Sequence, residues 1–215
     1  MKNNIKEVVF ILDKSGSMSG FEQDTMGGFN SAIRERRKLE GTVYVTTVLF
    51  NSNYEIIHDR LPVTEVPEMT AGEYSVGGCT ALLDAIGTAI RHIETVHRYI
   101  RPEDVPDQTL FLITTDGLEN ASRQFSSDEV KAMIRQKTEE NGWEFVFLAA
   151  NIDAVETAKG LGIREERAVN FKQSSRGIKA CFKAAKFLVC DASSDSFKTG
   201  KWREELDRQN REKDA

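Results

Sequence analysis

Short apolar runs alternate with amphipathic stretches along the chain. Runs rich in β-branched and aromatic residues predict β-strands at residues 7–12, 42–50, 54–61, 108–115, 143–150 and 167–171. Only the turn Asn51-Ser52-Asn53 separates the second run from the third, so the third strand is expected to form a hairpin and run antiparallel. Because most of the runs are apolar on both faces, they predict a mostly parallel sheet that is covered on both sides.

Apolar residues at helical spacing follow most of these runs. They predict helices around residues 26–33, at 80–100, from 126 to 142, at 153–161 and from 174 or 175 to 188. Ser126 and Glu129 have the spacing of a capping box, and Gly142 is a typical helix stop. The order of elements predicts an α/β fold. We expect a Rossmann-like, doubly wound, six-stranded sheet, mostly parallel with one antiparallel edge strand and with helices on both faces.

The polarity of the chain changes after Cys190. Residues 1–190 carry the predicted strands and helices, and we expect them to form one domain. Residues 191–215 are mostly polar and predict a C-terminal tail, with a charged helix around Trp202 and Leu206.

The composition of the chain excludes several classes of function. The 215 residues are 40% hydrophobic and 29% charged, as in ordinary globular proteins. The formal net charge of −5 argues against nucleic-acid binding, which needs concentrated positive charge. No apolar run approaches the roughly 18–20 residues of a membrane-spanning helix, so no membrane association is expected. Three cysteines and no secretory signal pattern favour a cytoplasmic location.

Polar side chains gather where three predicted elements begin or end. Asp13, Ser15 and Ser17 follow the first strand, where Gly16 lets the backbone pass close to an ion. Asp116 follows the fourth strand, and Thr80 precedes the long helix. Each residue alone would be explained as a helix cap or a turn residue. Two carboxylates and three hydroxyls at one sheet edge, however, predict a site for Mg²⁺ or Mn²⁺ rather than for zinc or copper.

These segments resemble the motifs of a known family. Residues 9–18 (VFILDKSGSM) are similar to the D-x-S-x-S motif of von Willebrand factor type A (vWA) domains. Residues 78–86 (GCTALLDAI) and 113–117 (ITTDG) resemble the segments that carry that family's threonine and second aspartate. The resemblance covers roughly residues 5–190, and the region after the fifth strand resembles compact, stand-alone bacterial members.

The resemblance implies a metal-ion-dependent adhesion site (MIDAS). Its Mg²⁺ shell would consist of Asp13, Ser15, Ser17, Thr80 and Asp116, some of them acting through water. An Asp or Glu of a protein partner would complete the coordination. We therefore expect a Mg²⁺-dependent protein-interaction module rather than an enzyme, with Mn²⁺ or Ca²⁺ as alternative ions. The oligomeric state stays open.

Two other functions stay open. A strand that ends in an aspartate beside Mg²⁺ also describes phosphatases and phosphotransferases of the haloacid-dehalogenase type, but these use a second Asp two positions on, where this chain has Ser15. Alternatively, the tail docks a structural subunit to an assembly through Trp202 and Leu206.

Three further features of the sequence have simpler structural explanations. Cys79 lies beside the predicted site without a neighbouring histidine in the sequence, and a small loop residue is its simpler explanation. A zinc site built from His58, His92 and His97 is not favoured. The basic run at residues 34–38 is expected to form a solvated helix face.

Overall fold

A six-stranded sheet forms the centre of the molecule. The structure is a computed structural model and describes residues 4–191 and 199–211. The strands are β1 (Lys6–Asp13), β2 (Val43–Phe50), β3 (Tyr54–Pro62), β4 (Gln108–Thr115), β5 (Glu144–Ala149) and β6 (Ala168–Asn170). Their order is β3-β2-β1-β4-β5-β6, and every neighbouring pair is parallel except β2 and β3. The predicted mostly parallel sheet with an antiparallel edge strand is therefore confirmed.

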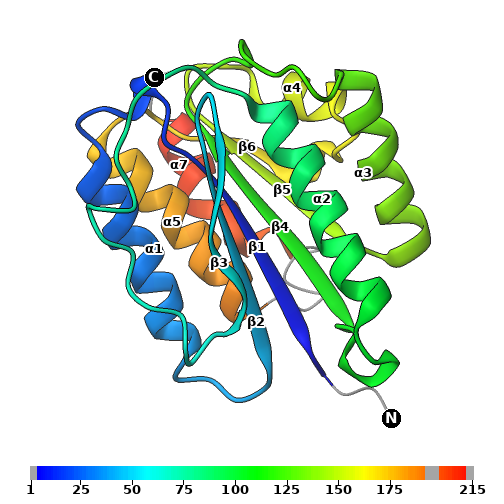
Figure 1. The fold of residues 1–215 in the computed structure, drawn as a ribbon. Coiled ribbons are helices and arrows are strands. Elements are labelled where there is room, and N and C mark those ends of the chain that lie inside the picture. The colour runs from blue at the N-terminus through cyan, green and yellow to red at the C-terminus, as the bar shows by residue number, and fades with distance from the viewer. Residues whose placement is uncertain (1–3, 192–198, 212–215) are drawn as a thin grey trace.

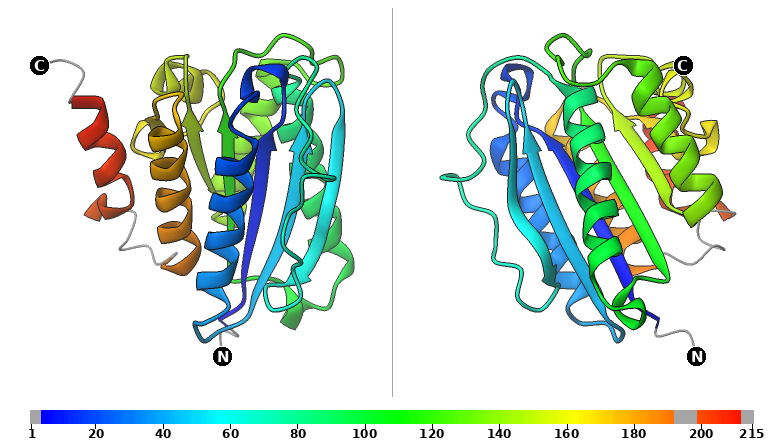
Figure 2. Two further views of the ribbon diagram at one scale, coloured as in Figure 1. Left: turned by 90° about the vertical axis from the view of Figure 1, so that its left-hand side faces the viewer. Right: turned by 45° about the vertical axis from the view of Figure 1, so that its right-hand side comes forward.

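Helices cover both faces of this sheet (Figure 1). They are α1 (Glu22–Arg36), α2 (Leu82–Tyr99), α3 (Ser127–Asn141), α4 (Ala154–Gly160), α5 (Ser175–Cys190) and α7 (Glu204–Arg211). Figure 2 shows α1, α5 and α7 on one side and α2 on the other. Both bonds of the predicted capping box between Ser126 and Glu129 start α3, and Gly142 ends it at φ 66°. In the described part of the chain, no helix is both long and apolar enough to cross a bilayer.

Two hydrophobic cores fill the space between the sheet and its helices. Phe10, Phe29 and Phe182 belong to the core beneath α1 and α5. Ile11 and Ile86 belong to the core on the opposite face, beneath α2, α3 and α4. Successive side chains of a strand point to opposite faces, so β1, which is buried on both sides, is apolar at every position from Val8 to Leu12.

The direction of the chain across the sheet changes between β1 and β4. From β1 the chain moves outward to β2 and β3, and it then returns to the other side of β1 with β4, β5 and β6. In open α/β sheets, ligands bind outside the carboxyl ends of the strands at such a switch point. The switch point therefore marks the edge of the sheet where a functional site is expected.

The C-terminal segment contributes to the core. Trp202 is 2% exposed and Leu206 is 1% exposed, and both belong to the core that contains α5. A charged helix is present as α7, but these two side chains are not available to anchor a partner, because this chain already buries them. The division of the chain at residue 190 stays a prediction, and residues 192–198 and 212–215 of the predicted tail lie outside the described residues.

The basic run at residues 34–38 is only partly solvated, contrary to expectation. Lys38 is exposed, but Arg36 is buried. The Arg36 guanidinium donates hydrogen bonds to the backbone carbonyls of Leu39 and Glu40, both at 2.9 Å. A chain leaving a helix has carbonyl groups without helical partners, and the fork of donors on Arg36 satisfies those that follow α1.

Candidate metal centre

Two neighbouring strands bring two aspartates to the switch point. Asp13 is the last residue of β1, and Asp116 follows the last residue of β4. The parallel register pairs Leu12 with Thr114, which places Asp13 beside the end of β4. Both aspartates are 1% exposed. Two buried carboxylates at one strand edge are electrostatically costly unless donors or a cation stabilise them.

Hydroxyl and amide donors hold the Asp13 carboxylate. Thr115 Oγ1 donates to Asp13 Oδ2 at 2.6 Å, and the Ser15 backbone N–H donates to Asp13 Oδ1 at 2.7 Å. Burial nevertheless raises the pKa of Asp13, and the hydrogen bonds from Thr115 and Ser15 only partly oppose this effect. A nearby cation would favour the ionised carboxylate in this environment.

The Ser15 backbone amide and the hydroxyls of Ser15 and Ser17 connect Asp13 to Asp116. Ser15 Oγ lies 3.0 Å from Ser17 Oγ, and Ser17 Oγ donates to Asp116 Oδ1 at 2.5 Å. The backbone N–H of Gly16 donates to the carbonyl of Gly78 at 3.0 Å, which ties this turn to the loop before α2. Four of the five predicted residues thus form one connected polar network.

Thr80 reaches the same space from a third loop. Its backbone N–H donates to Asn120 Oδ1 at 2.9 Å, and the Asn120 N–H donates back to the Thr80 carbonyl at 3.1 Å. A Cβ atom on Gly117 would lie 3.3 Å from Thr80 Oγ1 and 3.5 Å from Ser17 Oγ, so both hydroxyls line the space beside Gly117. The structure therefore brings all five predicted residues together. Their role as metal ligands stays a prediction.

Sequence reasoning missed three residues that hold this network in place. Thr115 donates to Asp13, as described above. Gln173 Nε2 donates to Asp116 Oδ2 at 2.7 Å, and the buried Tyr74 hydroxyl donates to the Asp13 carbonyl oxygen at 2.5 Å. Gln173 follows β6 at the carboxyl edge of the sheet, a position that indicates a strand end but not which residue the side chain contacts. Tyr74 is a single aromatic residue in a long loop and has no comparable signal.

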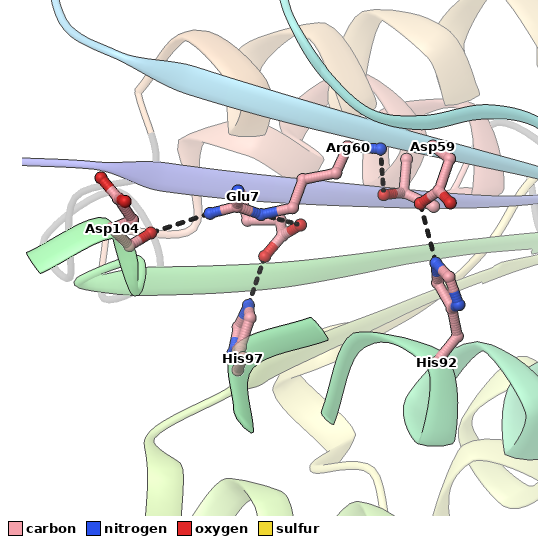
Figure 3. A network of polar contacts seen from close by, with 7 residues as sticks. Glu7, Asp59, Arg60, His92, His97 and Asp104 are labelled. Atoms are coloured by element: carbon pink, nitrogen blue, oxygen red, sulfur yellow. Dashed lines mark hydrogen bonds and ion pairs between the residues drawn. The ribbon is translucent and has the colours of Figure 1, made fainter. Parts of the chain in front are cut away.

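The donor set suits a hard cation. Among the described residues, no group of three or more His, Cys, Asp or Glu side chains lies close enough together to hold a metal ion. The histidines lie apart from one another: His92 pairs with Asp59 at 2.7 Å, and His97 contacts Glu7 (Figure 3). The candidate centre offers carboxylate and hydroxyl oxygens, which are ligands preferred by Mg²⁺ and related ions. These residues fit the cation that the motifs imply.

The same architecture is found in several solved proteins. The chain aligns with a von Willebrand factor type A protein from Catenulispora acidiphila at TM-score 0.56 and 14% identity, covering 86% of this chain and 42% of the other. This chain has the vWA fold. Proximal thread matrix protein 1 from the mussel byssus, with a zinc-occupied MIDAS motif, shares the fold at TM-score 0.56 and 16% identity, with 86% of this chain and 46% of that chain covered. The ArnB paralog VWA2 from Sulfolobus acidocaldarius aligns at TM-score 0.51 and 15% identity, with 84% and 45% covered.

At 14–16% identity these similarities show the vWA fold alone, and this chain spans less than half the length of each of the three solved proteins. No known family profile matches the sequence, and neither does any curated protein.

Proposed function

We propose that this chain is a Mg²⁺-dependent protein-binding module. The observation that carries the proposal is the polar network of Asp13, Ser15, Ser17 and Asp116, with Thr80 facing the same space, at the switch point of a vWA fold. These five residues would hold the ion directly or through water, and Mn²⁺ or Ca²⁺ could take its place. When bound, the ion supplies a fixed positive charge with a coordination position for an outside oxygen.

A partner carboxylate is the ligand that we expect to complete this site. The two aspartates carry two negative charges, which balance a divalent ion without excluding a further acidic ligand. An Asp or Glu side chain on a protein partner supplies such an oxygen. The zinc-occupied MIDAS of the mussel protein supports a divalent ion at this kind of site. We also propose a cytoplasmic location, because three cysteines are too few and too oddly numbered for a disulfide scaffold.

Binding rather than catalysis is the function that the network favours. A phosphotransferase of the haloacid-dehalogenase type needs a proton-donating aspartate two residues after the nucleophile, and Ser15 occupies that position. The Ser15 hydroxyl instead contacts Ser17 within the network. A magnesium-dependent release of phosphate from a generic ester that Asp13→Asn abolishes would favour the phosphatase.

Calorimetric titration with Mg²⁺ tests the proposed site. We expect the native chain to bind Mg²⁺ and Asp13→Ala to lose binding while its far-UV circular dichroism spectrum is unchanged. Asp13→Asn keeps the side-chain volume and serves as a second variant. Asp128→Asn, an exposed change on α3, is the matched control and should bind as the native chain does. Unchanged affinity in both Asp13 variants would contradict the assignment of the site.

A further inference from the structure

Gln173 approaches the candidate metal centre from a loop that carries none of the five predicted ligands. It lies between β6 and α5, directly before Ser174, whose hydroxyl accepts the Gly177 N–H at 3.1 Å and caps α5. Gln173 is itself exposed, so its placement does not follow from burial. The cap fixes the backbone at the start of α5, and the Gln173 side chain reaches from there to the network.

The Gln173 amide contacts two of the three ligand-bearing loops at once. Its Nε2 donates to Asp116 Oδ2 at 2.7 Å and to the Ser17 carbonyl oxygen at 3.0 Å. A carboxylate and a carbonyl can only accept, so the amide nitrogen is the atom that must face them. Ser17 follows β1 and Asp116 follows β4. Gln173 therefore links these two loops by hydrogen bonds beside the candidate metal centre.

We propose that Gln173 is a positioning residue of the metal centre that fixes the orientation of the Asp116 carboxylate. Ser17 Oγ donates to Oδ1 of Asp116 and Gln173 donates to Oδ2, so the two donors together restrict rotation of the carboxyl group. This inference rests on the proposed function, because it takes Asp116 as a ligand of the ion. Residues that orient a metal ligand by hydrogen bonds commonly contribute about 10–100-fold to metal affinity.

The neutrality of the Gln173 amide suits this role. A lysine or arginine at this position could also donate to Asp116, but its positive charge would repel a divalent cation bound beside the carboxylate. The amide supplies N–H donors without a charge. A glutamate at this position has no N–H to donate to Asp116.

Substitutions at Gln173 separate positioning from a structural role. Gln173→Met keeps the length of the side chain and removes both hydrogen bonds, and Gln173→Ala removes the side chain. We expect each to weaken Mg²⁺ affinity about tenfold, by analogy with other residues that orient metal ligands. Ser175→Ala, an exposed change two residues further on, is the matched control and should bind Mg²⁺ as the native chain does.

Titration calorimetry with magnesium chloride and thermal unfolding without metal are the two measurements. A purely structural role would lower the unfolding temperature of Gln173→Met and leave its Mg²⁺ affinity unchanged. Affinity within twofold of the native value for Gln173→Met would overturn the inference, as would an equal loss in Ser175→Ala. In those cases the native chain still binds Mg²⁺ and the proposed function stands. A native chain that does not bind Mg²⁺ would overturn both.

Discussion

Glu7 on β1 and His97 on α2 are hydrogen-bonded in the interior at the amino end of the sheet, opposite the candidate metal centre (Figure 3). Glu7 is fully buried, and Arg60 Nε lies 3.5 Å from its other carboxylate oxygen. The Arg60 guanidinium also donates to the Asp104 carbonyl at 2.8 Å and lies over the Tyr44 ring. A buried carboxylate is thus shared between two partners from different elements.

Removing His97 is expected to destabilise the fold because it leaves Glu7 with Arg60 alone. We expect His97→Leu to lower the free energy of unfolding by about 1–3 kcal/mol, the cost of leaving a buried hydrogen-bond acceptor without its donor. Glu7→Leu combined with His97→Leu should cost less than the sum of the two single changes, since the double variant leaves no buried carboxylate. Urea unfolding of the three variants measures this coupling, and additive losses would contradict it.

Adjacent glycines in α1 provide a matched test of helix packing. A Cβ atom on Gly28 would lie 2.4 Å from Phe182 Cγ on α5, whereas one on Gly27 would meet no atom within 4 Å. Gly28→Ala should force α1 and α5 apart and cost about 1–3 kcal/mol. Gly27→Ala should raise stability by about 0.5–1 kcal/mol through helix propensity. Denaturant unfolding should therefore show that the free energy of unfolding falls in Gly28→Ala and rises in Gly27→Ala. A change in the same direction for both variants would contradict the close approach of the two helices.

Features encoded by neighbouring residues could be predicted from the sequence. The β-branched run at residues 42–50 became β2, and the capping box and Gly142 set the ends of α3. The candidate centre could also be located, because Asp13 and Asp116 each directly follow a clear apolar strand and carboxyl ends of parallel strands share an edge.

Features that depend on distant contacts could not be predicted in this way. The Tyr74 hydroxyl reaches a residue 61 positions away, and the Gln173 amide reaches one 57 positions away. Neither residue lies in a periodic pattern that would reveal its partner. The burial of Trp202 and Leu206 could not be predicted either, because their neighbours in the sequence are polar. Whether such an isolated apolar pair is buried depends on where the chain packs after α5.

The buried contacts of the C-terminal segment predict that it stabilises the fold. Leu206→Ala should lower the free energy of unfolding by about 3 kcal/mol and Trp202→Ala by about 3–5 kcal/mol, as large-to-small changes in a core do. Glu204→Ala, an exposed change between them in sequence, should have little effect and serves as the control. Chemical denaturation tests this prediction, and three equal unfolding curves would contradict a core role for the segment.

Acid sensitivity is expected from His58. The ring is 2% exposed and stacks on Phe29 with 5.9 Å between ring centroids, and neither ring nitrogen has a hydrogen-bond partner among the described residues. Burial lowers the pKa of His58, an effect that the negative charge of Glu73 only partly opposes. In the unfolded chain His58 binds a proton near pH 6.5, and in the folded chain it does so at a lower pH. Stability contributed by the neutral ring is complete above about pH 6.5 and falls as the pH drops toward the lower folded pKa.

His58→Phe should remove this acid-dependent loss while keeping the stacked ring. The difference in unfolding free energy between His58→Phe and the native chain should widen below about pH 6.5, by at most about 1.4 kcal/mol per pH unit. Carboxylates that titrate in the same range cancel in this difference. Urea unfolding at several values between pH 5 and 7.5 provides the comparison, and parallel pH profiles for His58→Phe and the native chain would show that His58 is not the source.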